Sequence, residues 1–222
     1  MRVNLEGEEF KGVRLLGSNR VYEEVRAVRS TFSGCYLAQL DDPEYGLVVK
    51  NSSIEQCRLD RCSIQGVVFD TVTIDGLATK QLHRLHGCVF NRVTLRGKIG
   101  PIMAMGPHTS LPGRDNFIAS IVDKYQEIEW ALDISEATFS DADFYYVPGH
   151  LVRRDPETQP LLERERFSNV SASDLPTYAK IWVSRFNESP FSSLVGIAPK
   201  ASKYFNDYMR EIEWLRANNL VD

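Results

Sequence analysis

The chain has 222 residues, of which 43% are hydrophobic and 25% are charged, and both values are ordinary for a globular protein. Its formal net charge of −4 and pI near 5.7 argue against electrostatic binding of nucleic acid or of an anionic membrane. The first nine residues, Met1–Glu9, carry acids and lack an apolar core, so we expect no secretory signal. No apolar run approaches the roughly 18 residues of a membrane-spanning helix. These features predict a soluble cytoplasmic protein.

Along the chain, a clear repeat begins at Ser30 and is interrupted by Asp41–Gly46, where Pro and Gly indicate a loop. From Leu47 to Leu95 a large apolar residue recurs every five positions, and a smaller residue usually stands two places before it. After position 74 the pattern resumes one residue out of step. In chain order the large residues are Val49, Ile54, Leu59, Ile64, Phe69, Ile74, Leu85, Phe90 and Leu95.

A period of five fits neither a helix nor a simple strand, whose side chains repeat at about 3.6 and 2 residues. Residues two apart lie on the same side of an extended segment, so each apolar pair marks a short strand that faces inward. The next pair begins three residues later, and the chain must therefore bend once every five residues. Bends of about a right angle would close a square coil of roughly twenty residues, and successive coils would stack about 4.8 Å apart.

The best-formed repeats are at 57–60, 72–75, 137–140 and 142–144. The last two, Ala-Thr-Phe-Ser and Ala-Asp-Phe, place Ala before a polar residue and then Phe. This pattern resembles that of the pentapeptide-repeat family, whose members form a right-handed quadrilateral β-helix. Elsewhere Cys or Val replaces Ala, so the repeats are degenerate. The resemblance implies a mainly β fold with this solenoid, and the handedness rests on the resemblance alone.

All four cysteines stand two places before a large apolar residue, which predicts small, buried, unreactive side chains. They are Cys35, Cys57, Cys62 and Cys88. A disulfide or metal role is the alternative, although the spacing of Cys57 and Cys62 matches no usual zinc motif.

An amphipathic helix is predicted as an insertion at about 112–131, with Asp115 or Asn116 capping its start. Its apolar face would consist of Phe117, Ile121, Tyr125 and Ile128. The five-residue pattern then returns from Leu132 to Phe144, so the insertion belongs to the same domain.

Helical spacing marks two further segments near the C-terminus. One would start near Asp174 and Pro176, and the other would follow Phe205. Their apolar faces would be Tyr178, Ile181, Trp182 and Phe186, and then Phe205, Tyr208, Met209, Ile212 and Leu215. We therefore divide the chain into residues 1–147, a pentapeptide-repeat-like β-helix with the insertion, and residues 148–222, a loop and α-helical region that packs on or caps the solenoid.

The loop that leaves the last repeat is the predicted partner-binding site, because Tyr and Arg dominate interface hot spots and loops on a rigid scaffold carry function. Its candidate residues are Tyr145, Tyr146, His150, Arg153 and Arg154. The alternative is a structural loop that is tied down by an Arg–Asp pair and packed tyrosines.

Motifs for chemistry are sparse. His83, His86 and Cys88 superficially resemble a metal cluster, but the inward position of Cys88 argues against one, and we expect neither metal nor cofactor. His108 or His150 could act as a general base, yet no serine or cysteine stands in a recognisable nucleophile motif. The sequence also contains no phosphate-binding P-loop and no Gly-rich dinucleotide fingerprint.

These observations predict a non-enzymatic protein-binding scaffold, with a bacterial immunity or antagonist protein that neutralises one partner as the narrower form. One alternative comes from the resemblance, since the best-known family members mimic duplex DNA and bind gyrase. Such mimicry needs a strongly acidic surface, whereas the segment 30–99 has seven acidic residues against eight Lys and Arg. The other alternative is an enzyme with its site between the solenoid and the C-terminal helices, using His150, Arg153, Arg154 or Asp155.

Overall fold

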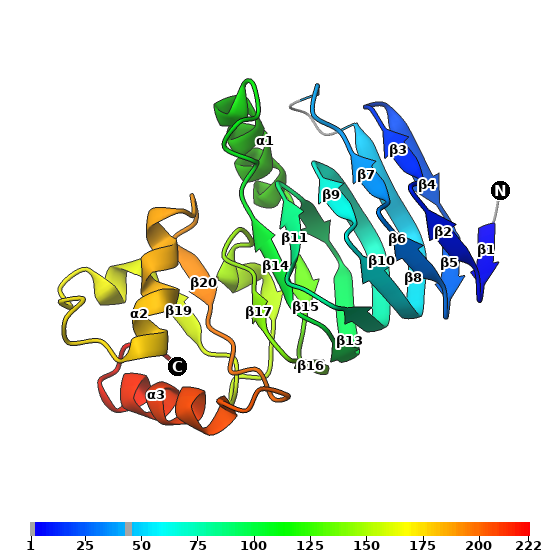
Figure 1. Ribbon diagram of the computed structural model, residues 1–222. Helices are drawn as coiled ribbons and strands as arrows, with labels where there is room; N and C mark the ends of the chain where they lie inside the picture. Colours follow the sequence, from blue (N-terminus) through cyan, green and yellow to red (C-terminus); the bar gives the residue numbers. More distant parts are fainter. Residues whose placement is uncertain (1–2, 43–45) are drawn as a thin grey trace.

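The computed structural model describes residues 3–42 and 46–222, and Figure 1 shows their course. The regular structure is mainly strands in parallel sheets, with a few helices beside them. Two expectations fall partly outside the described residues, namely the start of the chain at Met1 and Arg2 and the loop at Pro43, Glu44 and Tyr45. Among the described residues, no helix combines the length and the apolarity that crossing a membrane requires.

The first sheet has twelve strands, all paired in parallel. Its longest path runs through β1 (Val3–Glu6), β5 (Val25–Val28), β8 (Leu47–Asp60), β10 (Val67–Thr79), β13 (Val93–Ile99), β15 (Leu132–Asp133) and β18 (Val152–Arg153). The other members are β2 (Glu9–Lys11), β4 (Arg20–Glu23), β6 (Thr31–Ser33), β12 (Val89–Asn91) and β16 (Ala137–Phe139).

The second sheet has six strands and is also parallel. In spatial order it contains β17 (Ala142–Asp143), β14 (Ile102–Met105), β11 (His83–His86), β9 (Ser63–Gln65), β7 (Tyr36–Ala38) and β3 (Arg14–Leu16). A separate antiparallel pair joins β19 (Leu161–Glu163) to β20 (Ser193–Val195).

Neighbouring parallel strands pair with residues 19 to 22 positions further along the chain, except across residues 41–46, where the step is 27, and across residues 106–131, where it is 39 or 40. Val49 lies opposite Phe69, which in turn lies opposite Phe90, so the step changes from 20 to 21 residues. The extra residue of the second step explains why the apolar pattern shifts by one position after residue 74. The chain therefore returns to the same column of a sheet about once every four repeats.

A backbone in the left-handed region also recurs every five residues along the sheets. Between positions 51 and 76 these residues have φ of 50° to 74°, and each stands two places after a large apolar residue. They are Asn51, Gln56, Arg61, Gly66, Thr71 and Gly76. Glycine adopts this conformation without steric cost, whereas the other side chains are held in it by the pairing on either side. The bend expected once every five residues coincides with these positions.

In most of the apolar pairs between Leu47 and Leu95, the first residue is buried more deeply than the second. Leu47 and Val67 are fully buried, while Val49 and Ile64 are partly buried against the same core. Both members of a pair therefore contribute to the core.

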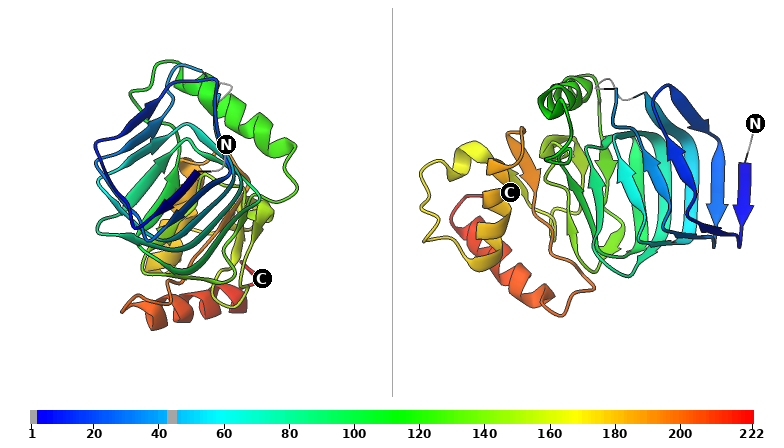
Figure 2. Two further views of the ribbon diagram at one scale, coloured as in Figure 1. Left: turned by 90° about the vertical axis from the view of Figure 1, so that its right-hand side faces the viewer. Right: turned by 45° about the horizontal axis from the view of Figure 1, so that its top comes forward.

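Helix α1 (Arg114–Gln126) lies between β14 and β15 in the chain and beside the sheets in space (Figures 1 and 2). Its buried residues are Phe117, Ile121 and Tyr125, as the helical spacing predicts. The Tyr125 hydroxyl accepts the backbone N–H of Phe90 at 3.2 Å, which fixes the helix to β12. The predicted cap is wrong, because the helix starts after Gly113, whose φ of 68° turns the chain into it.

The C-terminal segment lies at the end of the sheets away from the N-terminus (Figure 1). It contains helices α2 (Thr177–Ser184) and α3 (Phe205–Ala217) and the short 3-10 helices η1 (Gly149–Leu151), η2 (Arg164–Phe167) and η3 (Arg185–Asn187). The sequence did not predict β18, β19 or β20. Ile181, expected on the apolar face of α2, is instead 46% exposed.

Candidate functional site

The loop predicted to bind a partner is partly buried. Tyr145 and Tyr146 are 4% and 2% exposed, so they do not lie on the surface as a binding loop would require, and their role in partner binding stays a prediction. Their rings pack edge to face, and the Tyr146 ring also contacts Phe191 in the same way. Gly106 lies so close to Tyr146 that a Cβ at residue 106 would fall 2.7 Å from its ring. The tyrosines thus fill the joint between the sheets and the C-terminal segment.

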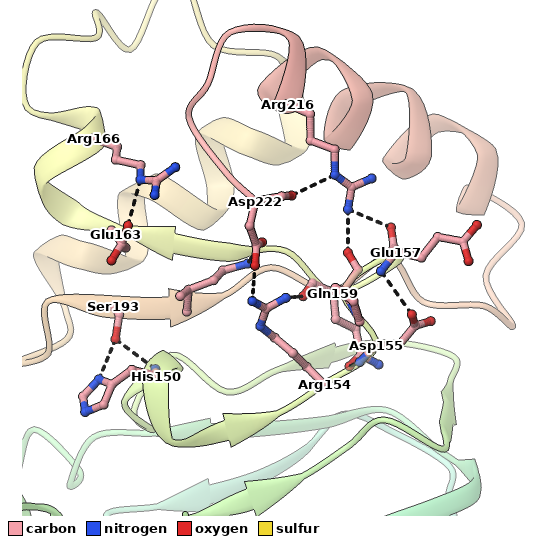
Figure 3. Close-up of polar contacts among 12 residues, drawn as sticks. His150, Arg154, Asp155, Glu157, Gln159, Glu163, Arg166, Ser193, Arg216 and Asp222 are labelled. Atoms are coloured by element: carbon pink, nitrogen blue, oxygen red, sulfur yellow. Dashed lines mark hydrogen bonds and ion pairs between the residues drawn. The ribbon is translucent and has the colours of Figure 1, made fainter.

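His150 contacts Ser193 from the C-terminal segment, as Figure 3 shows. The Ser193 hydroxyl oxygen accepts the His150 backbone N–H at 3.1 Å and lies 2.9 Å from Nδ1 of the same residue. Ser193 is 5% exposed, and no carboxylate of the described residues pairs with His150. The contact orients η1 against β20 and lacks the third group of a catalytic triad.

Arg153 and Arg154 also have partners within the protein. The Arg153 guanidinium lies 4.1 Å from the centre of the Trp130 ring. Arg154 donates to the Gln159 carbonyl at 3.0 Å and pairs with Asp222 near the end of α3 (Figure 3). The structural alternative thus describes Arg154 and the tyrosines better, although the acid paired with Arg154 is Asp222 rather than Asp155.

Asp155 also helps to hold the C-terminal segment in place. It accepts hydrogen bonds from Lys200 at 2.9 Å and from the Thr158 hydroxyl at 2.8 Å. Burial opposes its ionised form, but these bonds outweigh burial and hold the pKa of Asp155 below its ordinary value. The region from Tyr145 to Asp155 therefore fastens the C-terminal segment to the sheets.

The histidines and cysteines form no metal-binding group of three among the described residues. His83 is 6% exposed and belongs to β11, two places before Leu85. Its Nε2 is buried and has no hydrogen-bond partner. Burial lowers the pKa of His83 to about 4, so this imidazole is neutral at physiological pH.

The cysteines are free thiols in the positions expected of small core residues. Cys57 and Cys88 are 1% and 2% exposed, and burial raises the pKa of Cys88 to about 12. Cys35 and Cys62 are half-buried. A thiol such as Cys88, whose ionised form is disfavoured by burial, is a poor nucleophile.

A surface hollow of about 690 Å³ opens where four segments of the chain meet. We call it the basic hollow and define it by Arg84 and His86 of β11, His108 and Arg114 around the start of α1, and Tyr145 and Tyr146 at its floor. The remaining walls come from Met105–Thr109, Ile118 and Asn187–Pro190. The His86 and His108 rings lie 5.4 Å apart at 60°.

An ion-pair cluster lies behind the floor of this hollow. Arg185 of η3 donates to Asp143 at 2.8 Å and to Glu188 at 3.2 Å, and it covers the Tyr145 ring. Burial raises the pKa of Asp143 to about 6, and the neighbouring Arg185 opposes that rise. Among the described residues that line the hollow, Glu188 is the only acid, and it shares Arg185 with Asp143.

A second surface lies at the other end of the molecule. The described residues include seven exposed large hydrophobic side chains, and five of them fall between positions 13 and 40. We call these five the N-terminal apolar group: Val13, Leu16, Val21, Tyr36 and Leu40. They lie on or next to β3 and β4, which each pair along one side only, and β7, which is the neighbour of β3.

The two surfaces differ in chemistry, since the basic hollow is cationic and the N-terminal apolar group is hydrophobic. Sequence reasoning found neither, because each gathers residues that carry no shared motif. No protein-family model, curated protein or solved structure matches this chain.

Proposed function

We propose that this chain is a non-enzymatic protein-binding scaffold and that its parallel sheets form a right-handed quadrilateral β-helix of the pentapeptide-repeat kind. Two observations support this fold: the pairing step of about twenty residues and the left-handed residue once in every five. A scaffold of stacked strands is rigid and presents fixed side chains, which suits recognition of another protein.

The N-terminal apolar group carries the functional part of the proposal. Val21 is 58% exposed and Leu40 is 50% exposed, and hydrophobic side chains gathered at one end of a protein mark interaction sites. The strands next to them add backbone groups. Within the described residues each of β1, β2, β3 and β4 pairs along one edge only, which leaves the other edge open to a strand of a partner.

Neutralisation of one dedicated partner, as by an immunity or antagonist protein, is the narrower form of the proposal. Mimicry of duplex DNA fits less well, because acids and bases alternate across the sheets. Arg26 pairs with Glu55, Lys50 with Glu23, and Arg96 with Asp75, so these acids are matched by bases on neighbouring strands. A continuous acidic stripe would need those bases to be absent.

Affinity capture of the tagged full chain from its host lysate, with partner stoichiometry measured by mass spectrometry, tests the proposal. We expect one dominant partner at a fixed ratio. Leu16→Glu and Val21→Glu should abolish its capture, because each places a charge in the apolar surface. Ile181→Glu is the matched control, since this residue is equally exposed but lies on α2 in the C-terminal segment.

Equal capture by the wild type and both N-terminal variants would refute this binding surface. Absence of any partner over several growth conditions would refute the scaffold function itself. All variants must keep the wild-type circular dichroism spectrum and melting temperature. A loss of capture can then be attributed to the changed surface and not to unfolding.

A further inference from the structure

The basic hollow has the size and position of a small-molecule site. Its volume of about 690 Å³ falls within the roughly 300–1,000 Å³ of typical ligand pockets. It lies where the sheets meet the C-terminal segment, so its walls come from parts of the chain up to about a hundred residues apart. Neither the N-terminal apolar group nor the proposed protein partner involves these residues.

The walls carry an excess of positive charge. Within the described residues, Arg84 is exposed and has no ion-pair or hydrogen-bond partner. Arg114 lines the hollow and donates its Nε–H to the Pro107 carbonyl at 3.1 Å, which holds the side chain in place. Glu188 shares Arg185 with Asp143, so the three arginines and two acids of this region leave a formal excess of one positive charge. Planar guanidinium groups bind carboxylate and phosphate oxygens through paired hydrogen bonds.

The imidazoles add hydrogen-bonding groups to the hollow. Burial lowers the pKa of His86, a hydrogen bond to the Gly106 backbone opposes this, and the nearby His108 and Arg84 lower it further. His108 Nδ1 accepts the Ser110 backbone N–H at 3.3 Å and lies 2.8 Å from the Ser110 hydroxyl. The ring proton of neutral His108 is therefore on Nε2, which is left as a donor for a ligand.

The rest of the hollow suits an uncharged body attached to an anion. Met105 and Ile118 contribute apolar surface, and Tyr145 and Tyr146 contribute aromatic edges with hydroxyl groups. Arg114 lies close enough to the Tyr146 hydroxyl to favour its ionised form, while burial raises the pKa of this tyrosine overall. A free inorganic anion would leave most of this surface unused.

We propose that the basic hollow binds a small phosphate ester with a ring-bearing body. Arg84 and Arg114 hold the phosphate, and the ring lies against Met105 and Ile118. No covalent step is involved, and the ligand adds a second, independent binding activity to the scaffold.

Isothermal titration calorimetry of the full chain tests this with three probes: adenosine monophosphate, adenosine and inorganic phosphate. The ester should bind at least about tenfold more tightly than either fragment, since only it engages both parts of the hollow. We expect Arg84→Gln and Arg114→Gln each to lower the affinity for the ester by about 10- to 100-fold. This is the loss expected when charge-assisted hydrogen bonds are removed. Arg58→Gln is the matched control, because Arg58 is exposed on β8 and lies outside the hollow.

Three results would overturn the proposal: no heat of binding with the ester, equal affinity for inorganic phosphate, or an equal loss in Arg58→Gln. The last would mean that net charge alone governs binding. Arg84 has no partner to lose, so its variant should keep the wild-type melting temperature even if Arg114→Gln does not. Capture of the protein partner by Arg84→Gln should also be unchanged, so the scaffold function and the ligand site can fail separately.

Discussion

The two ends of the sheets follow the same repeat but bury it to very different extents. At the N-terminal end, Val3 and Leu5 of β1 are only half-buried. At the other end, Ala137 and Phe139 of β16 are 3% and 1% exposed. The difference lies in the next layer, because Ala201 of the C-terminal segment donates its backbone N–H to the Phe139 carbonyl at 2.9 Å. The repeat therefore sets the direction of a side chain, and a neighbouring layer sets its depth.

The largest expected effect is the difference in lost unfolding free energy when the same charge is placed at each end of the sheets. We expect Phe139→Asp to cost more than about 4 kcal/mol of unfolding free energy or to prevent folding, because an unpaired carboxylate would replace a fully buried ring. Phe10→Asp should cost only about 1–2 kcal/mol, since Phe10 is half-buried and packs on the single ring of Phe32. Urea unfolding followed by circular dichroism measures both. Equal costs would show that the N-terminal end is covered in solution.

His83 tests the effect of burial on an ionisable side chain, since it is buried on β11 between β9 and β14. The unfolded chain binds a proton near pH 6.5, but the folded chain does so only near pH 4, so stability is lost as the pH falls from 6.5 to 4. His83→Leu should remove this loss and raise the unfolding free energy by about 2 kcal/mol relative to wild type at pH 5.

The control for this prediction is the same pair of proteins at pH 8. There the imidazole is neutral in both the folded and the unfolded chain, so the difference between the two proteins should shrink. A gain that does not change between pH 8 and pH 5 would mean that His83 is protonated as readily in the folded chain as in the unfolded one.

The sequence predicted best those features that depend on local spacing. Val49 and Phe69 lie in adjacent strands because the five-residue pattern directs each apolar pair inward, and α1 follows from the helical spacing of Phe117 and Ile121. Strands β19 and β20 carry no such signal, since each has three residues and they pair about thirty positions apart.

The sequence offered burial of the tyrosines only as one of two alternatives, and it gave no sign of the basic hollow. Tyr146 is amphipathic, and only its packing against Phe191 and Gly106 makes it a core residue. Arg84, His108 and Arg114 meet through the path of the whole chain, and no motif links them.

A substitution of Val21, at the exposed N-terminal end, should have the smallest effect on stability. It is 58% exposed on β4 and lies opposite Val48 in the next strand inward. Val21→Glu should change the unfolding free energy by less than about 0.5 kcal/mol, because its side chain already lies in water. Val48→Glu, the same change one strand deeper, should cost about 1–2 kcal/mol. If Val21→Glu costs as much as Val48→Glu, the apolar end is covered by another molecule under the conditions of the measurement, and the cost should then fall on dilution.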